Sequence, residues 1–170
     1  AAEHLTIRLR REYELSRARV FWGLALGGPS KSAPWQREHM LAQLDSVLKA
    51  ATEENAKLLV TTSRRTPEWC SQWLHERAGK ASAIAYLLDA AQDPLNPLPA
   101  FYALCNRMLV TADSFSMVSE AANAGFRVEL IGTADAQRSG KLGRSLDYLV
   151  QQGIATEFSA VKTAPGGTPG

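Results

Sequence analysis

Short runs of apolar residues alternate along the chain with longer segments in which apolar residues recur at the spacing of a helix. The runs are typical of strands buried on both faces, and they cover residues 20–26, 58–62, 83–88, 108–111 and 128–131. The longer segments predict helices that begin near residues 34, 66, 99, 114 and 139. Strands that alternate with helices in this way predict a mostly parallel sheet covered by helices on both faces. The expected fold class is therefore α/β and Rossmann-like.

The two ends of the chain depart from this pattern. We expect residues 1–19 to form a helical connector and residues 20–158 to form the Rossmann-like domain. Residues 159–170 are rich in Pro and Gly, and a disordered tail is expected there. The chain opens on a polar helix without an initiator Met, which suggests that a preceding part is absent.

Composition narrows the class of protein. The apolar fraction of 45% and the charged fraction of 21% are ordinary for a globular domain. A net charge of +2 is too small for an extended nucleic-acid surface, so no nucleic-acid partner is expected. Cys70 and Cys105 lack the spacing of a metal or redox motif, and we expect core positions in a reducing compartment. No apolar run approaches the ~20 residues that cross a bilayer, and a cytoplasmic location is expected.

Ligands of an open parallel sheet lie beyond the carboxyl ends of its strands, so the polar residues that follow each strand are the candidates for a binding site. After the first strand, two glycines allow backbone amides to approach a phosphate, and a hydroxyl and an ammonium group follow. The candidate contacts of this turn are Gly27, Gly28, Pro29, Ser30 and Lys31. The alternative is a tight turn without a ligand.

The second strand ends in Ser63, Arg64 and Arg65. Guanidinium groups suit forked contacts with phosphate oxygens, and two of them follow one strand end here. The alternative is that one or both arginines are solvated or paired with an acid such as Glu68.

The fourth strand is followed by the densest polar cluster in the chain. Asp113 or Ser114 is expected to cap the next helix, whose free amides would face the ligand, and Met117 could pack on a base or ribose. The alternative is a capped helix without a ligand, in which the charge of Glu120 only complements the helix dipole. The candidate contacts are Asp113, Ser114, Ser116, Met117, Ser119 and Glu120. Three such clusters at one edge of one sheet indicate a single nucleotide site, in which a carboxylate can accept hydrogen bonds from the two ribose hydroxyls.

Four segments also resemble a known family: LGGPSK at 26–31, LLVTTSRRTP at 58–67, LVTADSFSMVSEAANAG at 109–125 and SGKLGRSLDYLVQQGIATEF at 139–158. They are similar to bacterial relatives of the plant mitochondrial-fission proteins of the elongated-mitochondria type. Members of that family have been described as nucleoside-diphosphate-sugar epimerases or as glycosyltransferases. The resemblance implies the C-terminal half of a B-type glycosyltransferase fold, in which the C-terminal domain binds the nucleotide-sugar donor.

A second resemblance concerns the segment VSEAANAG. It is similar to the S-E-x-x-x-x-G segment of the N-acetylglucosaminyltransferase of peptidoglycan synthesis, whose glutamate binds the ribose of its donor. This likeness implies the ribose role for Glu120 and a diphosphate loop at Gly27, Gly28 and Ser30. Arg127 stands where the family has a proline.

The leading hypothesis is the donor-binding domain of a metal-independent glycosyltransferase, with the nucleotide sugar as substrate and without a cofactor. The acceptor site, and any membrane or lipid acceptor, would belong to a missing N-terminal domain. The alternatives are an epimerase of the same fold and a non-enzymatic interaction module. His4, His39 and His75 lack metal spacing, and we expect surface or packing roles for them.

Overall fold

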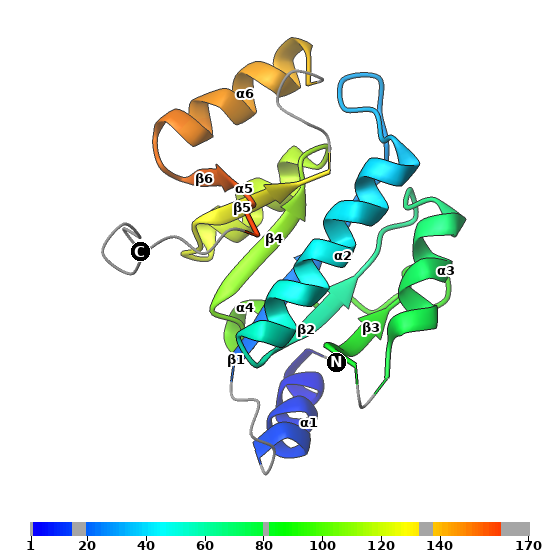
Figure 1. The fold of residues 1–170 in the computed structure, drawn as a ribbon. Coiled ribbons are helices and arrows are strands. Elements are labelled where there is room, and N and C mark those ends of the chain that lie inside the picture. The colour runs from blue at the N-terminus through cyan, green and yellow to red at the C-terminus, as the bar shows by residue number, and fades with distance from the viewer. Residues whose placement is uncertain (1, 15–19, 80–81, 133–137, 161–170) are drawn as a thin grey trace.

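The computed structural model describes residues 2–14, 20–79, 82–132 and 138–160 and shows one parallel sheet between two layers of helices (Figure 1). The strand order is β3-β2-β1-β4-β5-β6. The strands are β1 (Val20–Ala25), β2 (Ala56–Thr61), β3 (Ile84–Leu88), β4 (Arg107–Thr111), β5 (Val128–Ile131) and β6 (Ala155–Glu157). All described strand pairs are parallel, so the expected Rossmann-like class is confirmed.

Each face of the sheet has its own apolar core. The helices are α1 (Ala2–Glu14), α2 (Arg37–Glu53), α3 (Glu68–Arg77), α4 (Leu98–Leu104), α5 (Phe115–Asn123) and α6 (Gly140–Gln151). Helices α2 and α3 pack over one face, around Trp22 and Leu58. The other four helices cover the opposite face, around Leu59 and Phe101. Helices on both faces explain why the strands read as continuous apolar runs.

The strand order changes direction between β1 and β4. From β1 the chain proceeds outward through β2 to β3, and from β4 it proceeds to the other side through β5 to β6. The neighbours β1 and β4 pair in register from Trp22 and Arg107 to Ala25 and Val110. Connections that leave two adjacent strands in opposite directions open a crevice at the carboxyl ends of those strands.

The structure corrects several element boundaries. Strand β6 was not expected, since only three residues form it. Helix α2 begins at Arg37 instead of near Pro34. Helix α3 begins at Glu68 instead of near Thr66, whose hydroxyl donates to the Gly27 carbonyl oxygen in the loop after β1.

The helix expected near the N-terminus is present and shares the core of the domain. Leu5 and Leu9 of α1 are buried in the cluster that also contains Phe101 of α4. The hydroxyl of Tyr13 donates to the carbonyl oxygen of Ala85 at 3.4 Å. The rest of the predicted connector, residues 15–19, and the predicted disordered tail from residue 161 onward lie outside the described residues.

None of the helices described here combines the length and the apolar character that a membrane span requires.

Candidate functional site

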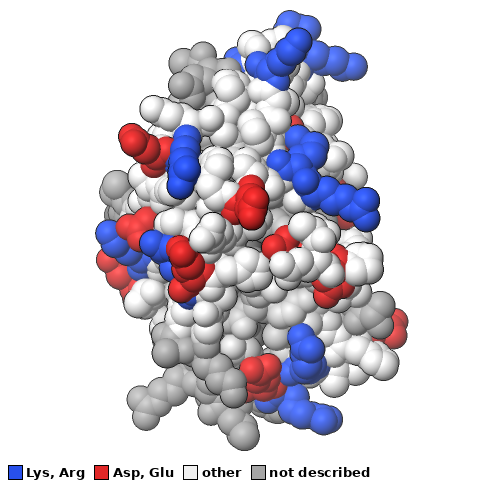
Figure 2. Space-filling model, turned by 90° about the vertical axis from the view of Figure 1, so that its right-hand side faces the viewer, with Lys and Arg blue, Asp and Glu red and all other residues white. Residues whose placement is uncertain are grey.

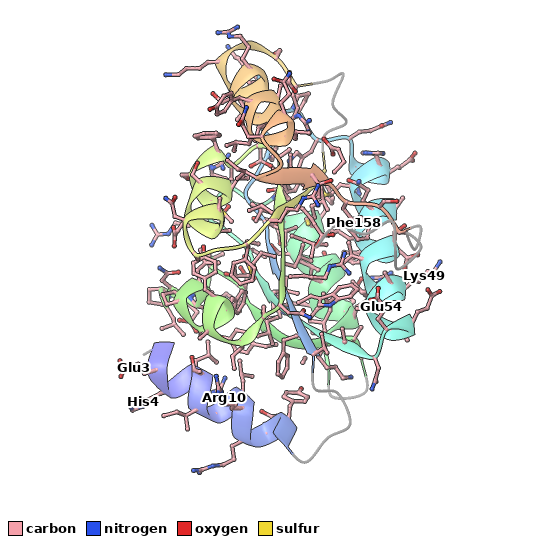
Figure 3. The ribbon with its side chains drawn as sticks, turned by 90° about the vertical axis from the view of Figure 1, so that its left-hand side faces the viewer. Glu3, His4, Arg10, Lys49, Glu54 and Phe158 are labelled. Carbon is pink, nitrogen blue, oxygen red and sulfur yellow. The ribbon has the colours of Figure 1, made fainter. Side chains whose placement is uncertain are left out.

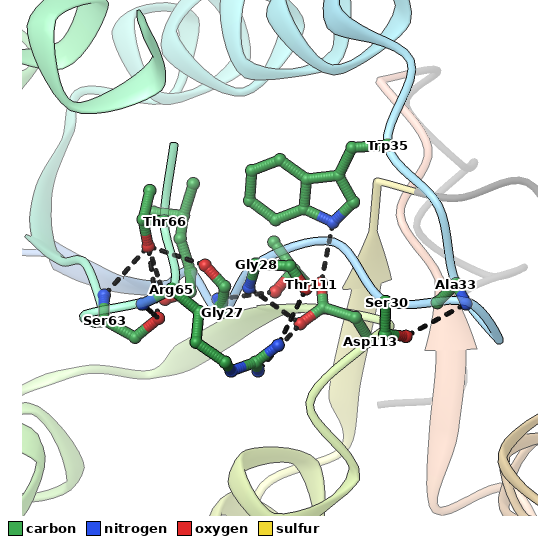
Figure 4. Close-up of polar contacts among 11 residues, drawn as sticks. Gly27, Gly28, Ser30, Ala33, Trp35, Ser63, Arg65, Thr66, Thr111 and Asp113 are labelled. Atoms are coloured by element: carbon green, nitrogen blue, oxygen red, sulfur yellow. Dashed lines mark hydrogen bonds and ion pairs between the residues drawn. The ribbon is translucent and has the colours of Figure 1, made fainter. Parts of the chain in front are cut away.

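Three loops meet at the carboxyl ends of β1, β2 and β4, and the carboxylate of Asp113 joins them (Figure 4). Its Oδ2 accepts hydrogen bonds from the Gly28 amide at 3.0 Å and from Arg65 Nη2 at 3.3 Å. Its Oδ1 accepts from Trp35 Nε1 at 2.8 Å. The Asp113 side chain is 0% exposed, so these bonds replace hydration that the carboxylate has lost.

Two threonines complete this arrangement. The Gly27 amide donates to Thr111 Oγ1 at 2.8 Å, and the Thr66 hydroxyl donates to the Gly27 carbonyl oxygen at 2.6 Å. Thr66 Oγ1 also accepts from the Ser63 amide at 2.9 Å. We use the term Asp113 network for the connected residues Gly27, Gly28, Trp35, Arg65, Thr66, Thr111 and Asp113.

The two glycines are explained by close packing within the Asp113 network. A Cβ atom at Gly27 would lie 2.2 Å from Asp113 Oδ2, and one at Gly28 would lie 2.2 Å from the Arg65 carbonyl oxygen. Both glycine amides already have protein acceptors. The glycines therefore have a structural reason of their own, and their role as phosphate donors stays a prediction.

The two arginines after β2 have different environments. Arg65 donates from Nη1 to the Gly28 carbonyl oxygen at 3.0 Å and pairs with Asp113, so its acidic partner is not Glu68. Its side chain is still 52% exposed. Arg64 is exposed and has no polar side-chain partner among the described residues. A guanidinium without such a partner is available to an anion.

Several other candidate residues lie at the surface of the same edge. Ser30 and Lys31 are exposed, and Ser30 Oγ accepts from the Ala33 amide at 3.1 Å. We use the term exposed rim for the residues Pro29, Ser30, Lys31, Arg64 and Ser116. Figure 2 shows side chains of both signs over one face of the molecule, without one continuous basic surface.

Helix α5 starts at this edge without the expected side-chain cap. Ser114 occupies the N-cap position, but neither its hydroxyl nor the carboxylate of Asp113 caps the helix. The Asp113 side chain is instead held by the loops after β1 and β2. The expected cap is therefore wrong, and the first amides of α5 have no side-chain acceptor.

Three further candidates, Met117, Ser119 and Glu120, lie on α5. The Glu120 carboxylate interacts with the hydroxyl of Tyr102 in α4. Burial raises the pKa of Tyr102, and the negative charge and hydrogen bonding of Glu120 raise it further. Met117 packs against the apolar core, and Ser119 is half-buried.

The start of helix α6 was not among the predicted site residues. The Ser139 amide donates to the Ser32 carbonyl oxygen at 3.0 Å, which holds this helix start against the loop after β1. Ser139 is the N-cap residue and makes no side-chain cap bond. The string Ser139-Gly140-Lys141 is the signal that could have identified it, since such a helix start favours anions.

The described residues contain no group of three or more His, Cys, Asp or Glu side chains arranged for a metal ion. Cys70 and Cys105 are buried, as expected. Burial raises the pKa of both thiols, that of Cys70 to about 12. Neither thiol has the character of a nucleophile.

Solved structures with a similar fold include a transferase and a ribonuclease. E. coli ADP-heptose LPS heptosyltransferase II matches with a TM-score of 0.50 and 15% identity, over 78% of this chain and 38% of the heptosyltransferase chain. MAR1 ribonuclease from Caenorhabditis elegans matches with a TM-score of 0.52 and 10% identity, over 84% of this chain and 79% of the ribonuclease chain. At these identities the likeness concerns the fold alone.

Among curated proteins no sequence matches this chain. A family model does match, and it covers residues 4–167, nearly the whole chain; its description is mitochondrial fission ELM1.

Proposed function

Because the chain belongs to the mitochondrial fission ELM1 family, we propose that residues 20–158 are the donor-binding domain of a glycosyltransferase that uses no metal. The observation that carries the proposal is the gathering of polar loops at the carboxyl ends of β1 and β4, where the strand order changes direction. Nucleotides bind at such switch points in open α/β sheets. The fold likeness to part of a heptosyltransferase supports the same assignment.

In this proposal the exposed rim contacts the diphosphate. Arg64 and Lys31 supply positive charge, and the uncapped starts of α5 and α6 supply backbone amides. These groups would stabilise the negative charge that develops on the leaving diphosphate. The Asp113 network acts indirectly, since it fixes the loop that carries Ser30 and Lys31.

The proposed role of Glu120 is to bind the ribose. Its carboxylate would accept hydrogen bonds from the two ribose hydroxyls and would exchange its contact with Tyr102 for them. A carboxylate suits a neutral diol better than a phosphate, so the ribose is the part of the donor that this residue favours.

Calorimetric titration of the chain with UDP, GDP and ADP sugars tests the proposal. We expect one of these compounds to bind, and no binding by any of them at millimolar concentration would contradict it. Glu120→Ala should weaken the nucleoside and the nucleotide sugar by the same factor, because both contain the ribose. Glu53→Ala is the matched control, because Glu53 is exposed in the last turn of α2.

The epimerase and the interaction module, the two alternative functions, predict different results in this titration. An epimerase of the same fold would bind the same donors and would convert the bound sugar without an acceptor. A non-enzymatic interaction module would bind none of them. The proposal also includes a second domain, which would hold the acceptor of the transferase. This applies equally to a lipid acceptor at a membrane surface.

A further inference from the structure

A recess lies at the outer edge of the sheet, beside β3. Its volume is about 400 Å³, and its walls come from the first turns of α1, from His75 of α3, from β3 and from the turn after β3. Strand β2 lies between β3 and β1, so the recess is about 10 Å or more from the crevice at β1 and β4. It is a separate candidate site.

The main acidic group of this recess is already satisfied by the protein. Asp89 Oδ2 pairs with His75 Nε2 at 3.0 Å. Asp89 Oδ1 accepts from the Ala91 amide at 3.0 Å and from the Thr62 hydroxyl at 3.4 Å. Asp89 therefore has little capacity left for a cationic ligand, although its charge contributes to the recess.

A second carboxylate is engaged in a similar way. Asp93 Oδ1 accepts from the Leu95 amide at 3.0 Å, which fixes the turn that forms one wall. Burial raises the pKa of the Tyr86 hydroxyl, the charge of Arg8 lowers it and the charge of Asp93 raises it, so Arg8 and Asp93 act on this hydroxyl in opposite directions.

Three donor groups in the recess form no hydrogen bond or ion pair with the described residues. The Arg8 guanidinium lies over the ring of Tyr86, 5.8 Å from its centroid, and forms no ion pair with a described residue. The hydroxyl of Tyr86 and the imidazole of His4 also have no acceptor within the described ranges. The exposed side chains of Arg8 and His4 and the partly buried Tyr86 hydroxyl therefore offer hydrogen-bond donors from two elements to a ligand in the recess.

We propose that this recess binds a small organic anion, whose carboxylate or phosphate group lies between the Arg8 guanidinium and the Tyr86 hydroxyl. Arginine presents several N–H groups in a fork that matches such oxyanions. The His75 imidazole, held by Asp89, forms the opposite wall. This site does not depend on the proposed donor site.

Titration of the isotopically labelled chain with inorganic phosphate and with citrate, at constant ionic strength, tests the proposal by two-dimensional amide NMR. We expect saturable shifts of the amides of Tyr86 and of residues 89–95. Shifts confined to residues 27–32 would place anion binding only in the donor crevice and would overturn the proposal. Glucose at the same concentration should leave residues 89–95 unchanged, and equal binding of glucose would also overturn it.

Arg8→Gln should weaken anion binding at residues 89–95 at least tenfold. Arg10→Gln is the matched control, since Arg10 belongs to the same helix (Figure 3) but is not among the residues that line the recess. Tyr86→Phe keeps the ring under Arg8 and should weaken binding a few-fold by removing only the hydroxyl. Unchanged affinity in folded Arg8→Gln protein, with folding verified by circular dichroism, would contradict the assignment.

Discussion

The Asp113 network and the exposed rim occupy the same edge of the sheet but use their polar groups in opposite ways. In the network, a carboxylate with 0% exposure accepts from Gly28, Trp35 and Arg65, and these bonds connect the loops after three strands. On the rim, the side chains of Lys31 and Arg64 extend into solvent. A shared location is therefore no guarantee of a shared role. Substitution in the network should change stability, and substitution on the rim should change binding.

The largest effect on stability is expected from Asp113→Ala. This change leaves the Gly28 amide and the Trp35 indole N–H without acceptors in a buried place, so the free energy of unfolding should fall by about 3 kcal/mol. Urea unfolding followed by circular dichroism measures the loss. A loss below about 1 kcal/mol would show that the network can be hydrated, and the comparison would fail.

Gly28→Ala tests the close packing of the same loop. The added Cβ would meet backbone atoms of Arg65, which cannot rotate away, so a loss of about 2 kcal/mol is expected. The matched substitution is Ser30→Ala on the exposed rim, for which a change within about 0.5 kcal/mol is expected. Equal effects of the two substitutions in urea unfolding would remove the distinction between network and rim.

Asp89→Asn extends the comparison to a carboxylate outside the crevice that is also satisfied by protein donors. Burial opposes ionisation of Asp89, but hydrogen bonds from His75, Ala91 and Thr62, together with the charge of His75, place its pKa below the ordinary value. A lowered pKa in the folded state stabilises the protein above the unfolded pKa of about 3.9. This stabilisation is lost as the pH falls through the folded pKa.

We therefore expect Asp89→Asn to cost about 1 kcal/mol at pH 7 and to cost progressively less below pH ~4. Urea unfolding of both proteins across this range measures the difference. A difference that is constant down to pH ~2 would contradict a role for the ionised carboxylate.

The smallest effects on stability should separate the two arginines. Arg65→Gln removes an ion pair whose cationic side chain is half exposed, and a loss of about 1 kcal/mol is expected. Arg64→Gln should change the free energy of unfolding by less than about 0.5 kcal/mol, because no described residue pairs with this guanidinium. A larger loss of stability for Arg64→Gln than for Arg65→Gln in thermal unfolding would contradict this distinction.

The sequence alone was sufficient for the fold class and for the edge of the sheet that carries the polar loops. Apolar runs such as residues 108–111 identify buried strands, and the carboxyl edge follows from parallel pairing. Strand β6 was missed because three residues give no periodicity.

The contacts within the site depend on tertiary structure and were not predictable in the same way. Asp113 was expected at a helix cap. Its oxygens instead accept hydrogen bonds from the Gly28 amide and from the indole of Trp35, which is 78 residues away in the sequence. Arg64 and Arg65 are adjacent and chemically identical in the sequence. Their roles differ because Arg65 pairs with Asp113 and packs on Gly28, whereas Arg64 does neither.

The affinity of Arg64→Gln for the nucleoside diphosphate that binds the wild-type chain tests the donor site most directly. Loss of one charged contact should weaken binding about tenfold while thermal unfolding stays unchanged. Calorimetry of wild type and variant under identical conditions provides the comparison. Equal affinity of the two proteins, or no binding by the wild type, would contradict the assignment of the exposed rim to the diphosphate.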